Sequence, residues 1–184
     1  MPDHLHLSLW LPDKKLLALP AAFSKVLAAF PFSRLRTELT LRVVAVEFNE
    51  PPLLEQEFAS ADDLDEIVAS AREFLHEDTA FQLEAYWDLM RWEGDWRLKP
   101  SPVSIEVYAP EFEAPNGEQV NLDLGMEELY TPETESPGSF RAVQGNVASV
   151  LHLQRDLENA LPLEKRLLWS DSGEDFLARF EALA

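Results

Sequence analysis

The side chains best able to do acid–base chemistry in this chain are carboxylates, because its 184 residues include 34 aspartates and glutamates but only four histidines and no cysteine. Two carboxyl groups at a suitable separation act as proton donor and proton acceptor in many hydrolases. Glu84 and Asp88 are spaced to share one face of a predicted strand, beside Tyr86. A chain so rich in acids is certain to hold some close pair, so Glu84 and Asp88 are catalytic candidates by position and not by motif.

His4 and His6 are the candidate metal ligands. They stand two residues apart on a predicted strand, a spacing that can direct two imidazoles toward one ion. Two ligands are fewer than a protein metal site needs, and the order of strands that would bring Glu38 near them is unknown. The sequence therefore predicts no metal and no cofactor, with His4 and His6 as the ligands to test first.

Several enzyme classes are excluded by missing motifs. A chain without cysteine has no thiol nucleophile, no thiolate metal site and no disulfide. Its six glycines form neither a Gly-x-Ser-x-Gly nucleophile elbow nor either of the common phosphate-binding loops. The sequence carries no catalytic signature, and it leaves open whether the chain is an enzyme.

Residues 86–97, which read YWDLMRWEGDWR, hold three of the five tryptophans among acids and arginines. By strand parity Tyr86, Met90 and Trp92 share the face opposite the core, and a tight turn would place Trp96 opposite Trp92. These four side chains are the predicted binding surface, since exposed aromatic patches mark sites for ligands or other chains. The alternative is that the tryptophans form cross-strand pairs that only stabilise a hairpin.

Negative charge is concentrated in the middle of the chain. Residues 1–48 carry six bases and four acids, residues 49–140 carry four bases and 23 acids, and residues 141–184 carry five bases and seven acids. The net charge of the whole chain is −19, which equals that of the middle segment alone. Such a field repels phosphate backbones and attracts basic proteins, so nucleic acid is an unfavoured partner. The alternative is that the acids only maintain solubility.

The hydrophobic pattern predicts an α+β fold with a largely antiparallel, mixed sheet of about five to six strands and three to four helices packed mainly on one face. Alternating apolar residues predict the strands, and three-four spacing predicts the helices. The expected strands cover residues 4–11, 35–48, 53–58, 81–90, 96–98, 103–109 and 119–124, and the expected helices cover 20–30, 64–75, 147–161 and a segment after Ser172.

The length suits one domain, so residues 1–184 are predicted to form a single α+β domain. Residues 125–140 hold proline, glycine, serine and threonine among four glutamates, which predicts a mobile loop. No apolar run reaches the length of about 18 residues that a membrane span needs, and residues 1–10 lack the pattern of a secretory signal. The expected location is the cytoplasm, with no membrane contact.

Three functional hypotheses follow. The first is a non-enzymatic cytoplasmic binding or assembly protein whose aromatic and acidic surface meets a second copy of the chain or another, basic, protein. The second is a hydrolase with carboxylate acid–base residues in a cleft, aided by a metal in one version. The third is an acidic mimic of nucleic acid that binds a basic protein.

Overall fold

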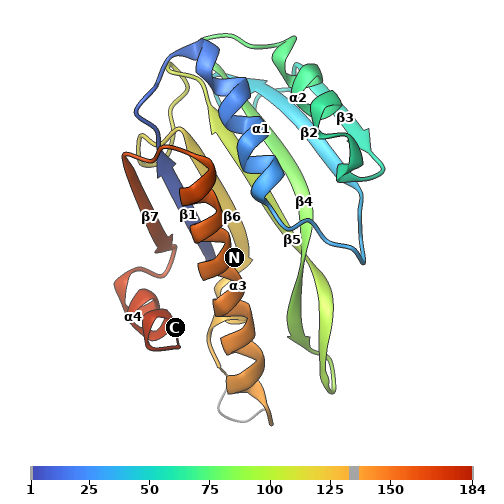
Figure 1. Ribbon diagram of the computed structural model, residues 1–184, viewed down its shortest axis with the longest axis vertical. Coiled ribbons are helices and arrows are strands. Elements are labelled where there is room, and N and C mark those ends of the chain that lie inside the picture. The colour runs from blue at the N-terminus through green and yellow to red at the C-terminus, as the bar shows by residue number, and fades with distance from the viewer. Residues whose placement is uncertain (1, 133–136, 184) are drawn as a thin grey trace.

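Seven strands form one antiparallel sheet in the computed structural model, which describes residues 2–132 and 137–183 (Figure 1). Their order across the sheet is β3-β2-β4-β5-β6-β1-β7. The strands are β1 (His4–Trp10), β2 (Leu39–Ala45), β3 (Leu54–Phe58), β4 (Thr79–Trp92), β5 (Trp96–Tyr108), β6 (Val120–Met126) and β7 (Lys165–Ser170). The helices are α1 (Leu19–Ala29), α2 (Leu64–Arg72), α3 (Ser139–Ala160) and α4 (Glu174–Leu183), and the short 3₁₀ helices are η1 (Leu16–Ala18), η2 (Ala61–Asp63) and η3 (Glu127–Tyr130). The predicted α+β class is confirmed, with more strands than the roughly five to six expected.

One face of the sheet is covered by α1, α2 and α3 and carries the core (Figure 1). Leu5, Leu7 and Leu9 of β1 point to this face and are almost fully buried. Phe23 of α1 packs on Phe81 of β4 with ring centroids 5.4 Å apart. The period of two in the strands and the three-four spacing in the helices therefore place their apolar sides on one shared core.

The opposite face, which we call the open face, is crossed by none of the described helices (Figure 1). Alternate residues of each strand point toward it, because successive side chains of a strand project to opposite sides. A sheet with one face in water carries polar residues there. The open-face residues of the central strands are Thr40, Arg42, Gln82, Glu84, Tyr86, Ser104, Asn121 and Asp123.

The β4–β5 hairpin extends beyond the rest of the sheet as a two-stranded arm. β2 pairs with β4 only as far as Glu84, and β6 pairs with β5 only from Ser104. Beyond these residues the two strands cross in Figure 1, since isolated two-stranded ribbons coil strongly. The free edge of β4 thereby meets α3, where the Asn146 amide accepts a hydrogen bond from the Met90 N–H (2.8 Å) and donates one to the Met90 carbonyl (2.9 Å). One buried asparagine anchors the arm.

Strand β5 runs without a break through Pro100 and Pro102, where the sequence predicted two separate strands. Both prolines oppose residues of β4, but pairing of β5 with β6 begins only at Ser104. The edge that would need their N–H groups is unpaired, and a sheet tolerates proline in that position. The predicted strands at 96–98 and 103–109 are therefore one strand.

Part of the predicted loop over residues 125–140 forms secondary structure. β6 continues to Met126, and η3 follows with Leu129 and Tyr130 buried. Leu129 and Tyr130 belong to the hydrophobic core, which gives this segment a packing role. Residues 133–136 of the predicted loop lie outside the described residues.

Two further regions of the sheet differ from the sequence prediction. The strand expected over residues 35–48 is limited to β2, because residues 35–38 form a loop and the backbone of Val46 turns into the left-handed region (φ 73°). Strand β7 was not predicted, and it lies at the edge of the sheet with Leu167 partly exposed. An edge strand of six residues buries too little to show a clear alternation.

Candidate functional site

A groove of about 860 Å³ lies on the open face above β2, β4 and β5. Its volume falls within the range of small-ligand sites. Side chains from β1 to β6 and from the loop before β2 surround it. The lining residues are His4, Arg36, Glu38, Leu39, Thr40, Glu57, Phe58, Ala59, Gln82, Glu84, Ala85, Tyr86, Pro102, Val103, Ser104 and Asp123.

The loop that forms one wall of the groove is held in place by Asp88. The Asp88 carboxylate accepts hydrogen bonds from the Ser33 hydroxyl and from the backbone N–H of Arg34 (2.9 Å). The Ser33 oxygen accepts from the N–H groups of Leu35 (3.1 Å) and Arg36 (2.9 Å). Asp88 therefore positions the wall through a buried serine, and both of its oxygens are already engaged.

Arg36 projects from this wall onto Tyr86. Its guanidinium carbon lies 4.1 Å from the centre of the Tyr86 ring, and its Nε lies 3.2 Å from Oε1 of Glu38. A hydrogen bond from the backbone N–H of Glu38 itself, followed by that from Arg36, lowers the pKa of Glu38 below the ordinary value of 4.5. A planar cation against a ring face and a carboxylate is a recurring recognition geometry.

The carboxylates of the groove differ in whether they have a partner, and Arg42 pairs with one of them. Its guanidinium contacts Glu84 (2.5 Å) and Glu55 (2.6 Å), and the hydrogen bond with Glu55 is the main cause that raises the pKa of Arg42. Glu57 has neither a hydrogen bond nor an ion pair from its side chain to any described residue, and it is exposed at the rim. The lining holds four carboxylates and one guanidinium, a formal charge of −3 with histidine neutral.

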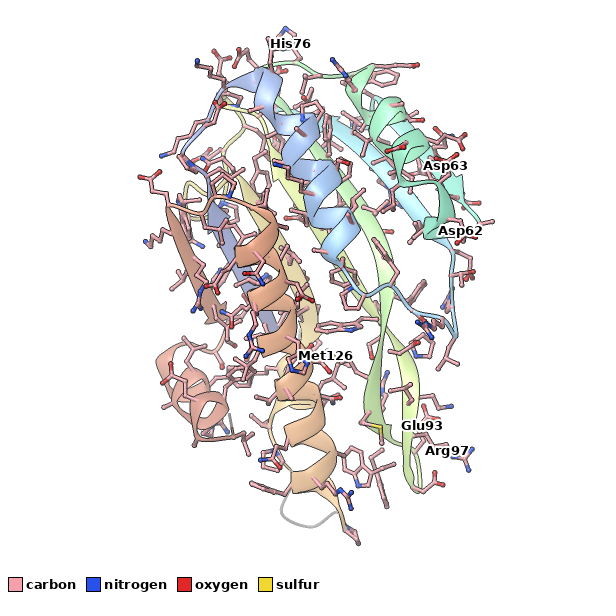
Figure 2. The ribbon with its side chains drawn as sticks, viewed as in Figure 1. Asp62, Asp63, His76, Glu93, Arg97 and Met126 are labelled. Carbon is pink, nitrogen blue, oxygen red and sulfur yellow. The ribbon has the colours of Figure 1, made fainter. Side chains whose placement is uncertain are left out.

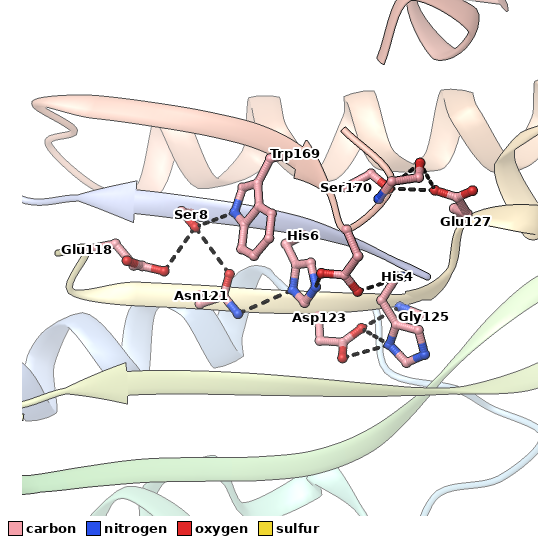
Figure 3. Close-up of polar contacts among 12 residues, drawn as sticks. His4, His6, Ser8, Glu118, Asn121, Asp123, Gly125, Glu127, Trp169 and Ser170 are labelled. Atoms are coloured by element: carbon pink, nitrogen blue, oxygen red, sulfur yellow. Dashed lines mark hydrogen bonds and ion pairs between the residues drawn. The ribbon is translucent and has the colours of Figure 1, made fainter. Parts of the chain in front are cut away.

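His4 and Asp123 form the far wall. Nδ1 of His4 lies 2.9 Å from both carboxylate oxygens of Asp123, and Oδ1 of Asp123 also accepts from the Gly125 N–H (2.9 Å) (Figure 3). Gly125 has φ 89°, and a Cβ there would lie 3.2 Å from the Pro102 carbonyl oxygen, so glycine is required. Asp123 thus fixes one imidazole nitrogen, and Nε2 of His4 has no hydrogen-bond partner among the described residues.

Next to this wall, the open face is closed by a polar network. The rings of His6 and Trp169 stack with centroids 4.2 Å apart, and the Trp169 indole N–H donates to the Ser8 oxygen (2.9 Å) (Figure 3). The Ser8 hydroxyl lies 3.1 Å from Oε1 of Glu118 and 3.2 Å from Oδ1 of Asn121. Ser8, Glu118 and Asn121 are nearly inaccessible to solvent. Trp169 therefore covers His6 and Ser8 on the open face of β1.

The structure separates the four predicted binding residues. Tyr86 lies on the floor of the groove, whereas Met90, Trp92 and Trp96 belong to the arm. Trp92 and Trp96 form the expected cross-strand pair, with centroids 5.5 Å apart, and the Trp96 indole N–H donates to the carbonyl of Pro137 (2.7 Å). Trp92 remains 40% exposed. The pair thus fastens the arm beside the start of α3, while Glu93 and Arg97 mark its tip in Figure 2.

The catalytic and metal candidates are not brought together. Glu84 pairs with Arg42 and Asp88 holds the loop, so the two carboxylates have separate partners. His4 and His6 have ring centroids 6.4 Å apart and pair with different aspartates. In the described residues no three histidine, aspartate or glutamate side chains are grouped as a metal would need.

Sequence reasoning missed Arg36, Glu57 and Asp123. Asp123 could not be found from its neighbours in sequence, because nothing local shows that β6 pairs with β1 and brings Asp123 to His4. The alternation of Asn121 and Asp123 in a predicted strand was the available signal that both face the same side.

Three comparisons with known proteins, against family models, curated proteins and solved structures, found no match. Among the described helices, none combines the length and the apolar character needed to cross a membrane.

Proposed function

We propose that this protein binds a positively charged partner and that the open-face groove receives the partner's basic side chains. The observation that carries the proposal is the hollow of about 860 Å³, in which four carboxylates face one arginine around an aromatic floor. A cleft lined by one sign of charge attracts ligands of the other sign. The net charge of −19 extends that attraction beyond the groove.

Two features favour binding over a purely structural role for this face. Glu57 is exposed without a partner in the described part of the chain, so its negative charge is available to a ligand. The floor consists of paired central strands, which hold Tyr86 and Gln82 in fixed positions. Binding to such a preformed site loses less conformational entropy than binding to mobile loops.

Self-association through the arm is the less favoured binding hypothesis. The Met90 backbone is already hydrogen-bonded to Asn146 of α3, and the Trp96 indole to the carbonyl of Pro137, two residues before α3 begins. Trp92 and Leu98 are the arm residues with the most apolar exposure, at 40% and 51%. Alanine at both positions should leave the oligomeric state unchanged in native mass spectrometry, and a dimer lost on substitution would restore that hypothesis.

The proposal is tested by fluorescence anisotropy with a labelled, amidated hexa-arginine peptide. The variant Glu38→Gln/Glu57→Gln removes two rim charges, and we expect about a five-fold weaker affinity because exposed ion pairs contribute up to about 1 kcal/mol. The matched control is Glu111→Gln/Glu113→Gln, which removes two exposed charges from the β5–β6 loop outside the groove. Equal loss in the two variants would mean general charge attraction, and no binding by the wild type would overturn the proposal.

The second candidate function is acid–base catalysis by His4 and Asp123. It is favoured by one observation, the imidazole held through Nδ1 at 2.9 Å from both carboxylate oxygens on the groove wall. An orienting carboxylate of this kind leaves the second nitrogen to accept or donate a proton. This pair replaces Glu84 and Asp88 as the acid–base candidate of the hydrolase hypothesis.

This second candidate has a matched control within the chain. Nδ1 of His76 lies 2.9 Å from Asp78, the same pairing, and Figure 2 places His76 at the end of the molecule opposite the arm. With a panel of activated esters, His4→Gln should abolish hydrolysis and His76→Gln should not. Equal rates in the two variants would reject the groove as the catalytic centre.

A further inference from the structure

The groove already contains one cation, the guanidinium of Arg36. It lies 4.1 Å from the Tyr86 ring centre and 3.2 Å from the Glu38 carboxylate. The loop that carries it is fastened by Asp88 and Ser33, so the position of the Arg36 backbone is set by the fold. The contacts of Arg36 therefore show that a guanidinium fits between Tyr86 and Glu38.

The fit is specific for a planar cation. A guanidinium stacks on an aromatic face and bonds a carboxylate in the same plane, while an ammonium is compact and more strongly hydrated. The Arg36 side chain is 51% exposed and that of Glu38 is 61% exposed, so the contact is weak and open to exchange. If a second guanidinium displaced Arg36, it would make the same contacts with the Tyr86 ring and the Glu38 carboxylate.

We propose, building on the cationic partner proposed above, that Tyr86 and Glu38 form an arginine subsite which Arg36 occupies until a partner's arginine displaces it. The groove therefore prefers arginine to lysine in its partner. Arg36 also lowers the affinity of the groove, because a bound partner must first move it from the ring.

The test compares variants that keep the charge and remove the planar group. Arg36→Lys retains the positive charge but stacks poorly on Tyr86. Arg34→Lys makes the same chemical change two residues away, at an exposed side chain that does not line the groove. Affinities are measured by fluorescence anisotropy with amidated hexa-arginine and hexa-lysine peptides.

We expect wild type to bind hexa-arginine about three-fold more tightly than hexa-lysine, the size of one exposed cation–ring contact. Arg36→Lys should raise the affinity for hexa-arginine about two-fold, and Arg34→Lys should leave it unchanged. Tyr86→Leu should bind the two peptides equally, with an unchanged circular dichroism spectrum as the check on folding. The Nε–H resonance of Arg36 should also move when hexa-arginine is added to the wild type.

The outcomes separate this inference from the proposed function. Equal binding of the two peptides, with no effect of Arg36→Lys, would overturn the arginine subsite and leave the cationic groove standing. An equal gain in Arg36→Lys and Arg34→Lys would also overturn it. Absence of saturable binding of both peptides to every variant would overturn both proposals.

Discussion

The two halves of the open face carry similar polar residues, but these residues bond one another in one half and line a hollow in the other. Over β1, β6 and β7 the polar side chains bond one another, and Trp169 stacks on His6 above them. Over β2, β4 and β5 the same kind of surface is hollow, and Glu57 has no partner among the residues described. One face of the sheet is thus closed by its own side chains in one half and hollow in the other.

Polarity alone therefore does not mark a binding site on this face. Glu118 and Glu57 are both glutamates on this side of the molecule, but Glu118 is 2% exposed and accepts hydrogen bonds from Ser8 and from the N–H of Asn116. A buried polar group with its partners in place stabilises the fold, whereas an exposed one without partners is available to bind.

The largest expected effect is on stability in the closed half. Trp169→Ala should lower the free energy of unfolding by about 3 kcal/mol, because it removes a large ring and leaves His6 and Ser8 uncovered. Trp92→Ala, on the exposed arm, should cost about 1 kcal/mol. Urea unfolding followed by circular dichroism measures both, and equal losses would contradict the covering role of Trp169.

Two serines on the open face, Ser8 in the closed half and Ser104 in the groove, should differ in their contribution to stability. Ser8→Ala should cost about 2 kcal/mol, since it removes the Ser8 hydrogen bonds to Oε1 of buried Glu118 and to the Trp169 N–H. Ser104→Ala, in the groove, should change stability by less than about 0.5 kcal/mol. If the groove serine proved the more costly, the assignment of closed and open halves would be reversed.

The groove wall should respond to Asp88. Asp88→Ala frees Ser33 and the backbone of Arg34, and we expect a loss of about 1.5 kcal/mol. The same variant should weaken peptide binding, because the loop no longer holds Glu38 beside Tyr86, and this loss should exceed the gain from releasing Arg36. Asp88→Asn keeps an acceptor oxygen, so its melting temperature and its peptide affinity should lie between those of Asp88→Ala and the wild type. Full loss of binding in Asp88→Ala without any loss of stability would instead indicate a direct contact between Asp88 and the peptide.

The smallest effect is electrostatic. The pKa of Glu38 is lowered by its backbone hydrogen bond and by Arg36, so its ionised form adds stability at neutral pH. Because the pKa is lower in the folded chain, that contribution is lost as the pH falls through the folded value. Arg36→Ala should raise the pKa of Glu38 toward 4.5 in a carbon-detected NMR titration, and an unchanged titration would show that the two groups are not coupled.

Local patterns predicted much of the fold. The alternation in β1 and β4 and the three-four spacing in α1 and α2 place the core correctly, because burial of one face imposes those periods. Strand β7 escaped prediction since it is short and lies at the sheet edge. Parity also placed Tyr86 and Asp88 opposite the core.

The site depends on contacts that no local pattern contains. Arg36 reaches Tyr86 from a loop, and Asp123 reaches His4 through the pairing of β6 with β1, 119 residues apart in sequence. Strand order decides both contacts, and strand order is set by long-range packing. The sequence could name the candidates on one strand but could not assign their partners.

The most direct test of the open groove is NMR mapping of the ¹⁵N-labelled protein with hexa-arginine. We predict that amide shifts cluster at residues 36–40, at Glu57 and at residues 82–86, and that those of Ser8 and Trp169 stay constant. Shifts centred on the closed half or on the arm, or spread evenly over the acidic surface, would contradict the account.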